Sequence, residues 1–287
     1  MLLFLLAKLK TLGSIIEELP YAATAINKIK SALKGTASLL PGVTSAFIML
    51  MAATFIIFHV PGMHRSYLRS HVGSKVVEIV RIREDGRMGG GTGSYVQAPS
   101  GQVYILTNAH VCDMYEGGAM ATVIMPDGSK MPRRILEISD KTDLCIIEAP
   151  PGVSGLKLAK SEAKVGENVY VVGHPKLMPL HISEGEVMGM SKVDVGLGVI
   201  GMDMKEEDCK KPKNRIINEE SFFGSMQVCV EEIDAVQTAA IGLPGNSGSP
   251  VVDSYGHVIG VLFAGDNEVH WSLLISYDDI VDFMAKY

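Results

Sequence analysis

The chain carries Gly242-Leu243-Pro244-Gly245-Asn246-Ser247-Gly248-Ser249-Pro250 near its C-terminal end. Ser247 stands in a glycine-rich turn directly before an apolar run. Glycine adopts backbone angles that a Cβ would forbid, and it lets backbone N–H groups converge beside a serine hydroxyl. Such a turn suits a nucleophile with its own oxyanion hole. A Gly-Asn turn with an incidental serine would have the same residues, so the rest of the chain must decide between the two.

Two side chains upstream supply the groups that a serine nucleophile needs. His110 directly follows an apolar run, 103–106, and Asp143 directly precedes another, 144–147. Imidazole titrates near neutrality and can take the serine proton, while a carboxylate fixes its tautomer and stabilises the imidazolium. The order His, Asp, Ser is one of the known orders of a catalytic triad. We therefore predict a triad, although His110 alone could be a core histidine and Asp143 alone a strand-start cap.

From His71 onward, short β-rich runs alternate with turn residues. About a dozen such runs predict an all-β barrel or sandwich. The tail Tyr277–Lys286 has apolar residues on one face and predicts a closing helix, whereas residues 198–228 predict an exposed insertion or long loop. The expected strands are Lys75–Arg83, Gly93–Gln97, Val103–Thr107, Ala121–Met125, Arg134–Ile138, Leu144–Glu148, Asn168–Val172, Gly185–Met190, Asp234–Thr238, Val251–Asp253, Val258–Phe263 and His270–Ile275.

The first 71 residues differ from the rest in charge. They hold seven Lys/Arg against two Glu, a net charge of +5, so the remainder carries −11 of the total of −6. A basic apolar arm on an acidic body argues against a nucleic-acid partner and suits contact with anionic lipid. We expect two domains, an N-terminal anchor at 1–71 and a catalytic domain at 72–287.

Two segments of this arm predict helices. Residues 1–19 have a helical apolar stripe, which predicts an in-plane amphipathic helix or a helix packed on the protein's own body. Residues 43–60 are apolar and lie in a stretch without charged side chains, which predicts a single transmembrane helix, with a buried core helix as the alternative. Lysines and arginines are balanced on the two sides of this span, so the sequence does not indicate which side of the membrane holds the catalytic domain.

The four cysteines contain no C-x-x-C pair, so a zinc ribbon or a redox motif is unsupported. Cys112 and Cys145 lie in apolar runs and are expected to be buried thiols, whereas Cys209 and Cys229 could pair. The histidines outside the triad show no metal-ligand spacing. We therefore expect neither a metal nor another cofactor.

Several motifs around the triad occur in a fixed order. They are Gly91-Thr92-Gly93-Ser94, Thr107-Asn108-Ala109-His110-Val111, Thr142-Asp143-Leu144-Cys145-Ile146, Val172-Gly173-His174-Pro175, Gln237-Thr238-Ala239-Ala240-Ile241 with Gly245-Asn246-Ser247-Gly248, and Gly256-His257-Val258-Ile259-Gly260-Val261. On these motifs residues 72–287 resemble the trypsin-like serine proteases, and most closely their HtrA-type branch. The resemblance implies the chymotrypsin fold, which is two six-stranded antiparallel β-barrels followed by a C-terminal helix. It also implies a serine endopeptidase that acts on polypeptides without a cofactor.

The resemblance also implies a role for each matching residue. Ser247 would be the nucleophile, His110 the general base and then acid, and Asp143 the residue that orients His110. The backbone N–H groups of Gly245 and Ser247 would form the oxyanion hole. The pocket for the residue before the scissile bond would hold no charge, so we expect it to accept apolar side chains. Its walls would be Ile241, Gly242, Leu262, Phe263 and Ala264.

The chain departs from the HtrA pattern in two respects. It has one extra residue between Ile241 and Gly245, and Ser249 stands where glycine is usual. The cysteine that extracellular trypsins carry next to the histidine is shifted to Cys112 and has no evident partner, which favours a reducing compartment or a branch without disulfides. Two alternatives stay open, a catalytically silent binding module on the same fold and a viral protease. The second rests on residues 1–71, which resemble in layout the hydrophobic segments before the protease in sobemovirus-like polyproteins.

Overall fold

A computed structural model of the chain describes Thr54 and residues 62–82, 88–112, 120–139, 141–202, 205–210, 214–221, 224–266 and 271–287. The chain divides into two compact units, residues 1–72 and 73–287. In the first unit the described helix is α4, Met63–His71. The helix expected at 1–19 and, apart from Thr54, the span expected at 43–60 lie outside the described residues. Within these ranges no helix has both the length and the apolar character needed to cross a bilayer.

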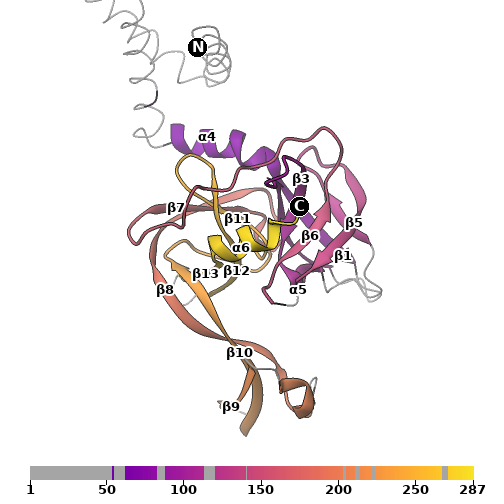
Figure 1. Cartoon of the computed structure of the whole chain (residues 1–287), viewed down its shortest axis with the longest axis vertical. Coiled ribbons are helices and arrows are strands. Elements are labelled where there is room, and N and C mark those ends of the chain that lie inside the picture. The colour runs from indigo at the N-terminus through magenta and orange to yellow at the C-terminus, as the bar shows by residue number, and fades with distance from the viewer. Residues whose placement is uncertain are drawn as a thin grey trace, which may run out of the picture. The chain divides into compact units, whose positions relative to one another are not determined.

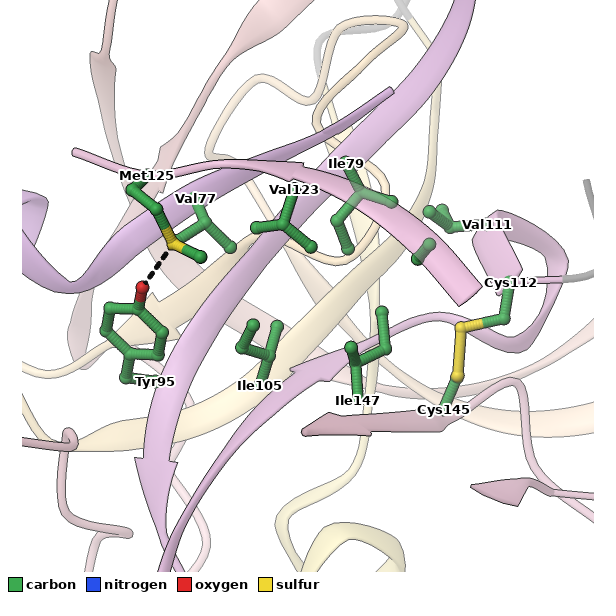
Figure 2. Close-up of a cluster of buried hydrophobic side chains, with 11 residues drawn as sticks. Val77, Ile79, Tyr95, Ile105, Val111, Cys112, Val123, Met125, Cys145 and Ile147 are labelled. Atoms are coloured by element: carbon green, nitrogen blue, oxygen red, sulfur yellow. Dashed lines mark hydrogen bonds between the residues drawn. A yellow bond between two sulfur atoms is a disulfide. The ribbon is translucent and has the colours of Figure 1, made fainter. Parts of the chain in front are cut away.

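The first β-barrel consists of six antiparallel strands that close in the order β1-β2-β3-β6-β5-β4. Branched apolar side chains from its strands meet in the interior, as period-two alternation requires; Figure 2 shows Val77, Ile79 and Ile105 among them. The strands are β1 (Val76–Ile82), β2 (Met88–Gln97), β3 (Val103–Thr107), β4 (Met120–Ile124), β5 (Lys130–Ile138) and β6 (Cys145–Glu148).

The second barrel has the strand order β13-β12-β11-β7-β8-β10, and pairing between β10 and β13 closes it. The predicted pair of six-stranded barrels is therefore confirmed. Helix α6 (Tyr277–Met284) follows β13, and the hydroxyl of Ser276 caps it by accepting the N–H of Asp279 at 3.2 Å. The strands are β7 (Asn168–Gly173), β8 (His181–Val199), β10 (Gly224–Thr238), β11 (Pro250–Val252), β12 (Val258–Asp266) and β13 (Trp271–Ile275).

Residues 198–228, expected as an exposed insertion or a long loop, contain β-strands that extend beyond the barrel, so the alternative of a long loop was wrong. Strand β8 continues to Val199 and pairs with β10 as far as Val228, so the two form one long ribbon beyond the barrel (Figure 1). Strand β9 (Asn214–Ser221) adds to the outer part of β10 as a seventh strand. A disulfide between Cys209 and Cys229 joins the short 3₁₀ helix Glu206–Cys209 to β10.

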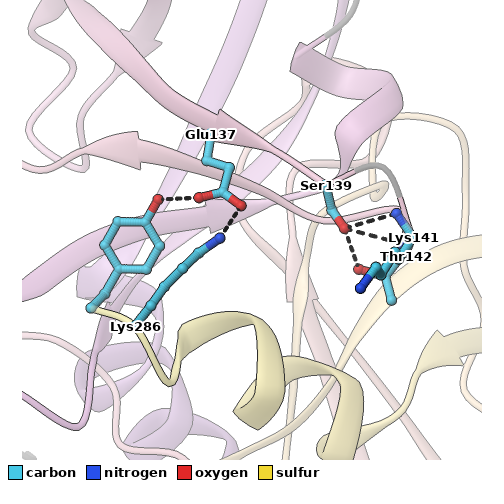
Figure 3. A network of polar contacts seen from close by, with 6 residues as sticks. Glu137, Ser139, Lys141, Thr142 and Lys286 are labelled. Carbon is cyan, nitrogen blue, oxygen red and sulfur yellow. Dashed lines mark hydrogen bonds and ion pairs between the residues drawn. The ribbon is translucent and has the colours of Figure 1, made fainter.

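The end of the chain is fastened to the first barrel through Glu137 on β5 (Figure 3). Tyr287 donates its hydroxyl to the Glu137 carboxylate at 2.6 Å, and Lys286 pairs with the same group. Burial would raise the pKa of Glu137, but hydrogen bonds from Lys286 and Tyr287 outweigh it, so the net pKa is lowered. Burial and the bond to Glu137 raise the pKa of Tyr287. These contacts connect the segment after α6 to the barrel that carries His110.

Candidate active site

His110 and Asp143 lie at the same end of the first barrel. Strands β3 and β6 pair with Thr107 opposite Cys145. The segment that follows β3 and the segment that precedes β6 therefore meet. Helix α5 (Ala109–Cys112) begins two residues after β3 and carries His110. On the other side, the hydroxyl of Ser139 accepts the N–H groups of Lys141 and Thr142 at 3.2 and 3.1 Å (Figure 3), which shapes the turn just before Asp143.

Both carboxylate oxygens of Asp143 bind His110. Oδ2 lies 2.7 Å from the ring Nδ1, and Oδ1 accepts the backbone N–H of His110 at 2.9 Å. The side chain of Asn108 donates to the Asp143 carbonyl at 2.8 Å. An ionised carboxylate can only accept, so Nδ1 carries a proton, and in the neutral imidazole Nε2 then keeps its lone pair. His110 is thus held as the tautomer that a general base needs, and half of its side chain is exposed.

The turn around Ser247 leaves two backbone donors without an acceptor. Across the four peptide units between residues 244 and 248, every carbonyl oxygen accepts a hydrogen bond. The N–H groups of Asn246 and Gly248 donate to Leu243 and Leu262. Among the described residues, the N–H groups of Gly245 and Ser247 have no acceptor. Gly245 and Ser247, the two expected oxyanion-hole donors, are partly exposed, so their N–H groups are left available to an acceptor from outside the chain.

Hydrogen bonds to the carbonyl groups of the preceding residues fix the direction of these two N–H groups. In a trans peptide the N–H points opposite to the carbonyl of the preceding residue, and the chain has no cis peptide bond among its described residues. The Pro244 carbonyl accepts the N–H of Lys176 at 2.6 Å, which sets the Gly245 N–H. The Asn246 carbonyl accepts the N–H of Ser249 at 2.8 Å, which sets the Ser247 N–H.

Gly91 on β2 brings the turn close to α5. A Cβ at Gly91 would lie 2.6 Å from the Val111 side chain and 2.8 Å from the Ser247 carbonyl oxygen, so both segments pack against this glycine. The structure therefore brings the neighbour of His110 and the backbone of Ser247 together. Over the described residues it contains no hydrogen bond between the Ser247 hydroxyl and His110. In free enzymes such bonds are often long and tighten only with substrate bound.

A protein-family model described as a trypsin-like peptidase domain matches residues 91–261. The chain belongs to this family. The match includes all three members of the predicted triad and both predicted oxyanion-hole donors.

Curated relatives of this trypsin-like chain include HtrA-type serine proteases. The Serine protease Do-like HtrA of Bacillus subtilis is 25% identical over 203 residues, which cover 69% of this chain and 36% of that protein. The DegP-like periplasmic serine endoprotease of Chlamydia pneumoniae is 30% identical over 174 residues, covering 60% and 28%. The chain therefore spans about a third of the length of these relatives.

Solved structures show the same fold. A protease from M. tuberculosis in its active form has a TM-score of 0.58 at 20% identity, covering 79% of this chain and 86% of that one. The serine endoprotease from Yersinia pestis has a TM-score of 0.55 at 17% identity, covering 79% and 67%. At these identities the likeness establishes the trypsin-like fold alone.

Of the five predicted pocket residues, Gly242 and Leu262 lie side by side. A Cβ at Gly242 would lie 2.9 Å from the Leu262 side chain and 2.6 Å from the Ser272 hydroxyl. The Ser272 hydroxyl donates to the Ala240 carbonyl at 2.6 Å, so its hydrogen is already engaged in a hydrogen bond within the protein. Leu262 and Phe263 are buried, Ala264 is partly buried and Ile241 is exposed. These distances place Leu262 and Ser272 beside Gly242, but they do not show Phe263 in contact with Gly242.

Cys112 and Cys145 are buried as predicted, but the prediction that they are thiols was wrong, because the two residues form a disulfide (Figure 2). Each cysteine follows a residue of the predicted triad by two positions, so the bridge runs beside the His110–Asp143 pair. Sequence spacing could not reveal it, because the partners come from different elements and are 33 residues apart. Cys209 and Cys229, left open as a pair, are also bonded. The reducing compartment expected from an unpaired Cys112 loses its basis.

Proposed function

We propose that the chain is a serine endopeptidase that cleaves polypeptides through an acyl-enzyme. Ser247 attacks the scissile carbonyl while His110 takes its proton at Nε2, and Asp143 stabilises the imidazolium. The N–H groups of Gly245 and Ser247 bind the oxyanion of the tetrahedral intermediate. His110 then returns the proton to the leaving amine, and water hydrolyses the acyl-enzyme by the same steps in reverse. No cofactor takes part in this scheme.

One observation carries the proposal more than any other. In the turn around the serine, the two N–H groups without an acceptor among the described residues are those of Gly245 and Ser247. Losing one such donor typically costs about 100- to 1000-fold in rate. A silent binding module has no need to keep two oriented donors free beside a serine. The His110–Asp143 contacts support the same conclusion, since they hold the imidazole ready to accept a proton.

The specificity belongs to the same proposal. We infer that Ile241, Gly242, Leu262, Phe263 and Ala264 form a pocket that prefers apolar side chains. The approach of the Leu262 side chain to Gly242 supports a narrow pocket. We expect a peptide library with all residue types at the position before the scissile bond to be cut mainly after apolar residues.

The library is best read by mass spectrometry, with Ser247→Ala as the blank. Cleavage that disappears in the blank and follows apolar residues supports both parts of the proposal. Serine-dependent cleavage mainly after Lys or Arg would overturn the pocket while leaving the peptidase intact. No serine-dependent cleavage of any library member or of an unfolded polypeptide would favour the silent binding module.

We also propose that the chain works in an oxidising compartment and is anchored to a membrane. The printed name of the Chlamydia pneumoniae relative describes that protein as periplasmic, and two disulfides suit an oxidising compartment of that kind. We propose that residues 72–287 form the peptidase domain and that residues 1–71 tether it to a membrane. The support for the tether is the apolar span 43–60 and the net charge of +5. Alkaline extraction of membranes tests it, since a spanning chain stays with the lipid and a surface-bound one is released.

The disulfide beside the triad should matter for rate. Closing a 33-residue loop contributes about 3–4 kcal/mol in the chain-entropy model, and small misplacements of catalytic groups cost up to about 100-fold. We expect the double variant Cys112→Ala with Cys145→Ala to unfold at lower temperature and to lose about 10- to 100-fold in kcat. Thermal melts and peptide hydrolysis measure both effects.

The second disulfide provides the matched control. Cys209→Ala with Cys229→Ala removes a bridge between β10 and its neighbouring 3₁₀ helix, away from the triad. We expect this variant to keep kcat within about threefold of the original chain. Equal losses of kcat in the two double variants would contradict a specific link between the first bridge and the His110–Asp143 pair.

A further inference from the structure

Thr92 on β2 uses every one of its hydrogen-bonding groups and is fully buried. Its N–H donates to the Ser247 carbonyl at 2.8 Å, and its hydroxyl donates to the Gly245 carbonyl at 2.9 Å. The same hydroxyl accepts the N–H of His174 at 3.1 Å, and the Thr92 carbonyl accepts the hydroxyl of Thr107 at 2.7 Å. Thr92 of the first barrel thus binds both Gly245 and Ser247, the residues whose N–H groups are the expected oxyanion-hole donors.

The turn can approach Thr92 only because it lacks a side chain at Gly248. That glycine has φ +84°, and a Cβ there would lie 2.1 Å from the Thr92 carbonyl oxygen and 2.2 Å from the Thr107 hydroxyl. No side chain fits at such distances without moving the backbone of β2. The close contact between the barrels therefore depends on one residue from each side. These residues are Thr92 on β2 and Gly248 directly after Ser247.

The hydroxyl of Thr92 has a defined direction. Because its oxygen already accepts the His174 N–H, its own hydrogen is left for the Gly245 carbonyl. His174 is in turn held by its ring, since Nδ1 lies 3.0 Å from the Met178 carbonyl and 3.3 Å from Glu78 on β1. Two residues further on, Lys176 donates to the Pro244 carbonyl and so sets the Gly245 N–H. The peptide units on both sides of Gly245 are therefore held by hydrogen bonds. Lys176 binds the one before it, and Thr92 binds the one after it.

We propose that Thr92 is a positioning residue for the oxyanion hole, and that its hydroxyl keeps the turn of Gly245 and Ser247 in register with the barrel that carries His110. The proposal rests on the proposed function. It assigns to Thr92 no contact with substrate. Its effect comes through Gly245 and Ser247, whose N–H groups would meet the charge that develops in the transition state. Loss of the Thr92 hydroxyl should therefore lower kcat more than it changes KM.

The test compares two substitutions of Thr92. Thr92→Val keeps the shape of the side chain and removes the hydroxyl, which leaves the Gly245 carbonyl and the His174 N–H without this partner. Thr92→Ser keeps the hydroxyl. We expect Thr92→Val to lose about 10- to 100-fold in kcat with KM within about threefold of the original, and Thr92→Ser to stay within about threefold in both.

Thr238 provides a matched control for the cost of losing a buried hydroxyl. It is fully buried on β10, donates to the Glu186 carbonyl at 3.0 Å and accepts the Ala240 N–H at 3.2 Å. It does not bind Gly245 or Ser247. We expect Thr238→Val to lower the melting temperature about as much as Thr92→Val does, while kcat stays within about threefold.

Several outcomes would overturn the proposal. They are a Thr92→Val variant with kcat within threefold of the original, equal losses of kcat in Thr92→Val and Thr238→Val, or no rescue by Thr92→Ser. If Thr92→Val does not fold, Thr92→Cys takes its place, since a thiol is a weak donor of similar size. Complete unfolding of Thr92→Val and Thr92→Cys would make Thr92 a folding residue and would also overturn it. An original chain without Ser247-dependent hydrolysis would instead refute the proposed function.

Discussion

Asp143→Asn is expected to lower kcat by about 10⁴-fold, the size of effect known for this exchange in other Ser-His-Asp enzymes. In the original chain the Asp143 carboxylate accepts from the His110 ring Nδ1 at 2.7 Å and from the His110 N–H at 2.9 Å. The amide keeps one acceptor for the backbone but can turn its NH₂ group toward Nδ1. The ring would then carry its proton on Nε2, where the serine proton must go. Peptide hydrolysis by the folded variant measures the loss.

The chain contains a second His–Asp pair that serves as the control. Asp253 contacts His257 in the same way, with its two oxygens 3.1 Å from the ring Nδ1 and 2.8 Å from the backbone N–H. This pair lies in the turn between β11 and β12, and Asp253→Asn should leave kcat unchanged within about threefold. A variant Asp143→Asn that keeps more than a tenth of the activity, or an equal loss in Asp253→Asn, would contradict the assigned role of Asp143.

The parts of the fold that the sequence predicts well are short elements between clear turn residues. Strand β3 has the predicted bounds, Val103–Thr107, and α6 lies within the predicted tail helix. The strand is a short apolar run and the helix has one apolar face, and in both the apolar pattern agrees with the flanking residues. The ends of β3 and β6 then follow from barrel closure, which is why His110 and Asp143 could be predicted as neighbours from their places beside these strands.

The ribbon beyond the second barrel could not be predicted for a physical reason. Met188 and Met190 on β8 and Ile216 on β9 are exposed, so these strands lack the buried apolar face on which the prediction of a strand depends. These strands are defined by their hydrogen bonds to one another, and a single sequence does not show which segments pair. The disulfides and the bonds of Thr92 also join residues far apart in the chain, so no local pattern marks them.

Ser247→Ala is the other change with a very large expected effect. Removing the nucleophile of a Ser-His-Asp enzyme typically lowers kcat by about 10⁶-fold, because no other group can form the acyl-enzyme. The substitution deletes one hydroxyl from a partly buried turn whose peptide units are held by other residues. We therefore expect the variant to melt within about 2 °C of the original chain, since such changes usually alter stability by less than about 0.5 kcal/mol.

The most direct test of the central claim is the reaction of the full chain with a fluorophosphonate, followed by mass spectrometry of the intact protein and of its peptides. We predict one adduct on the folded chain, on Ser247, that is absent from Ser247→Ala and strongly slowed in His110→Ala. The adduct should be unchanged in the control variant Ser254→Ala, which alters the turn between β11 and β12. Heat-denatured protein should not react, since the reactivity depends on the assembled site. A folded chain that takes up no label, or a label that survives in Ser247→Ala, would contradict the claim that Ser247 is an activated nucleophile.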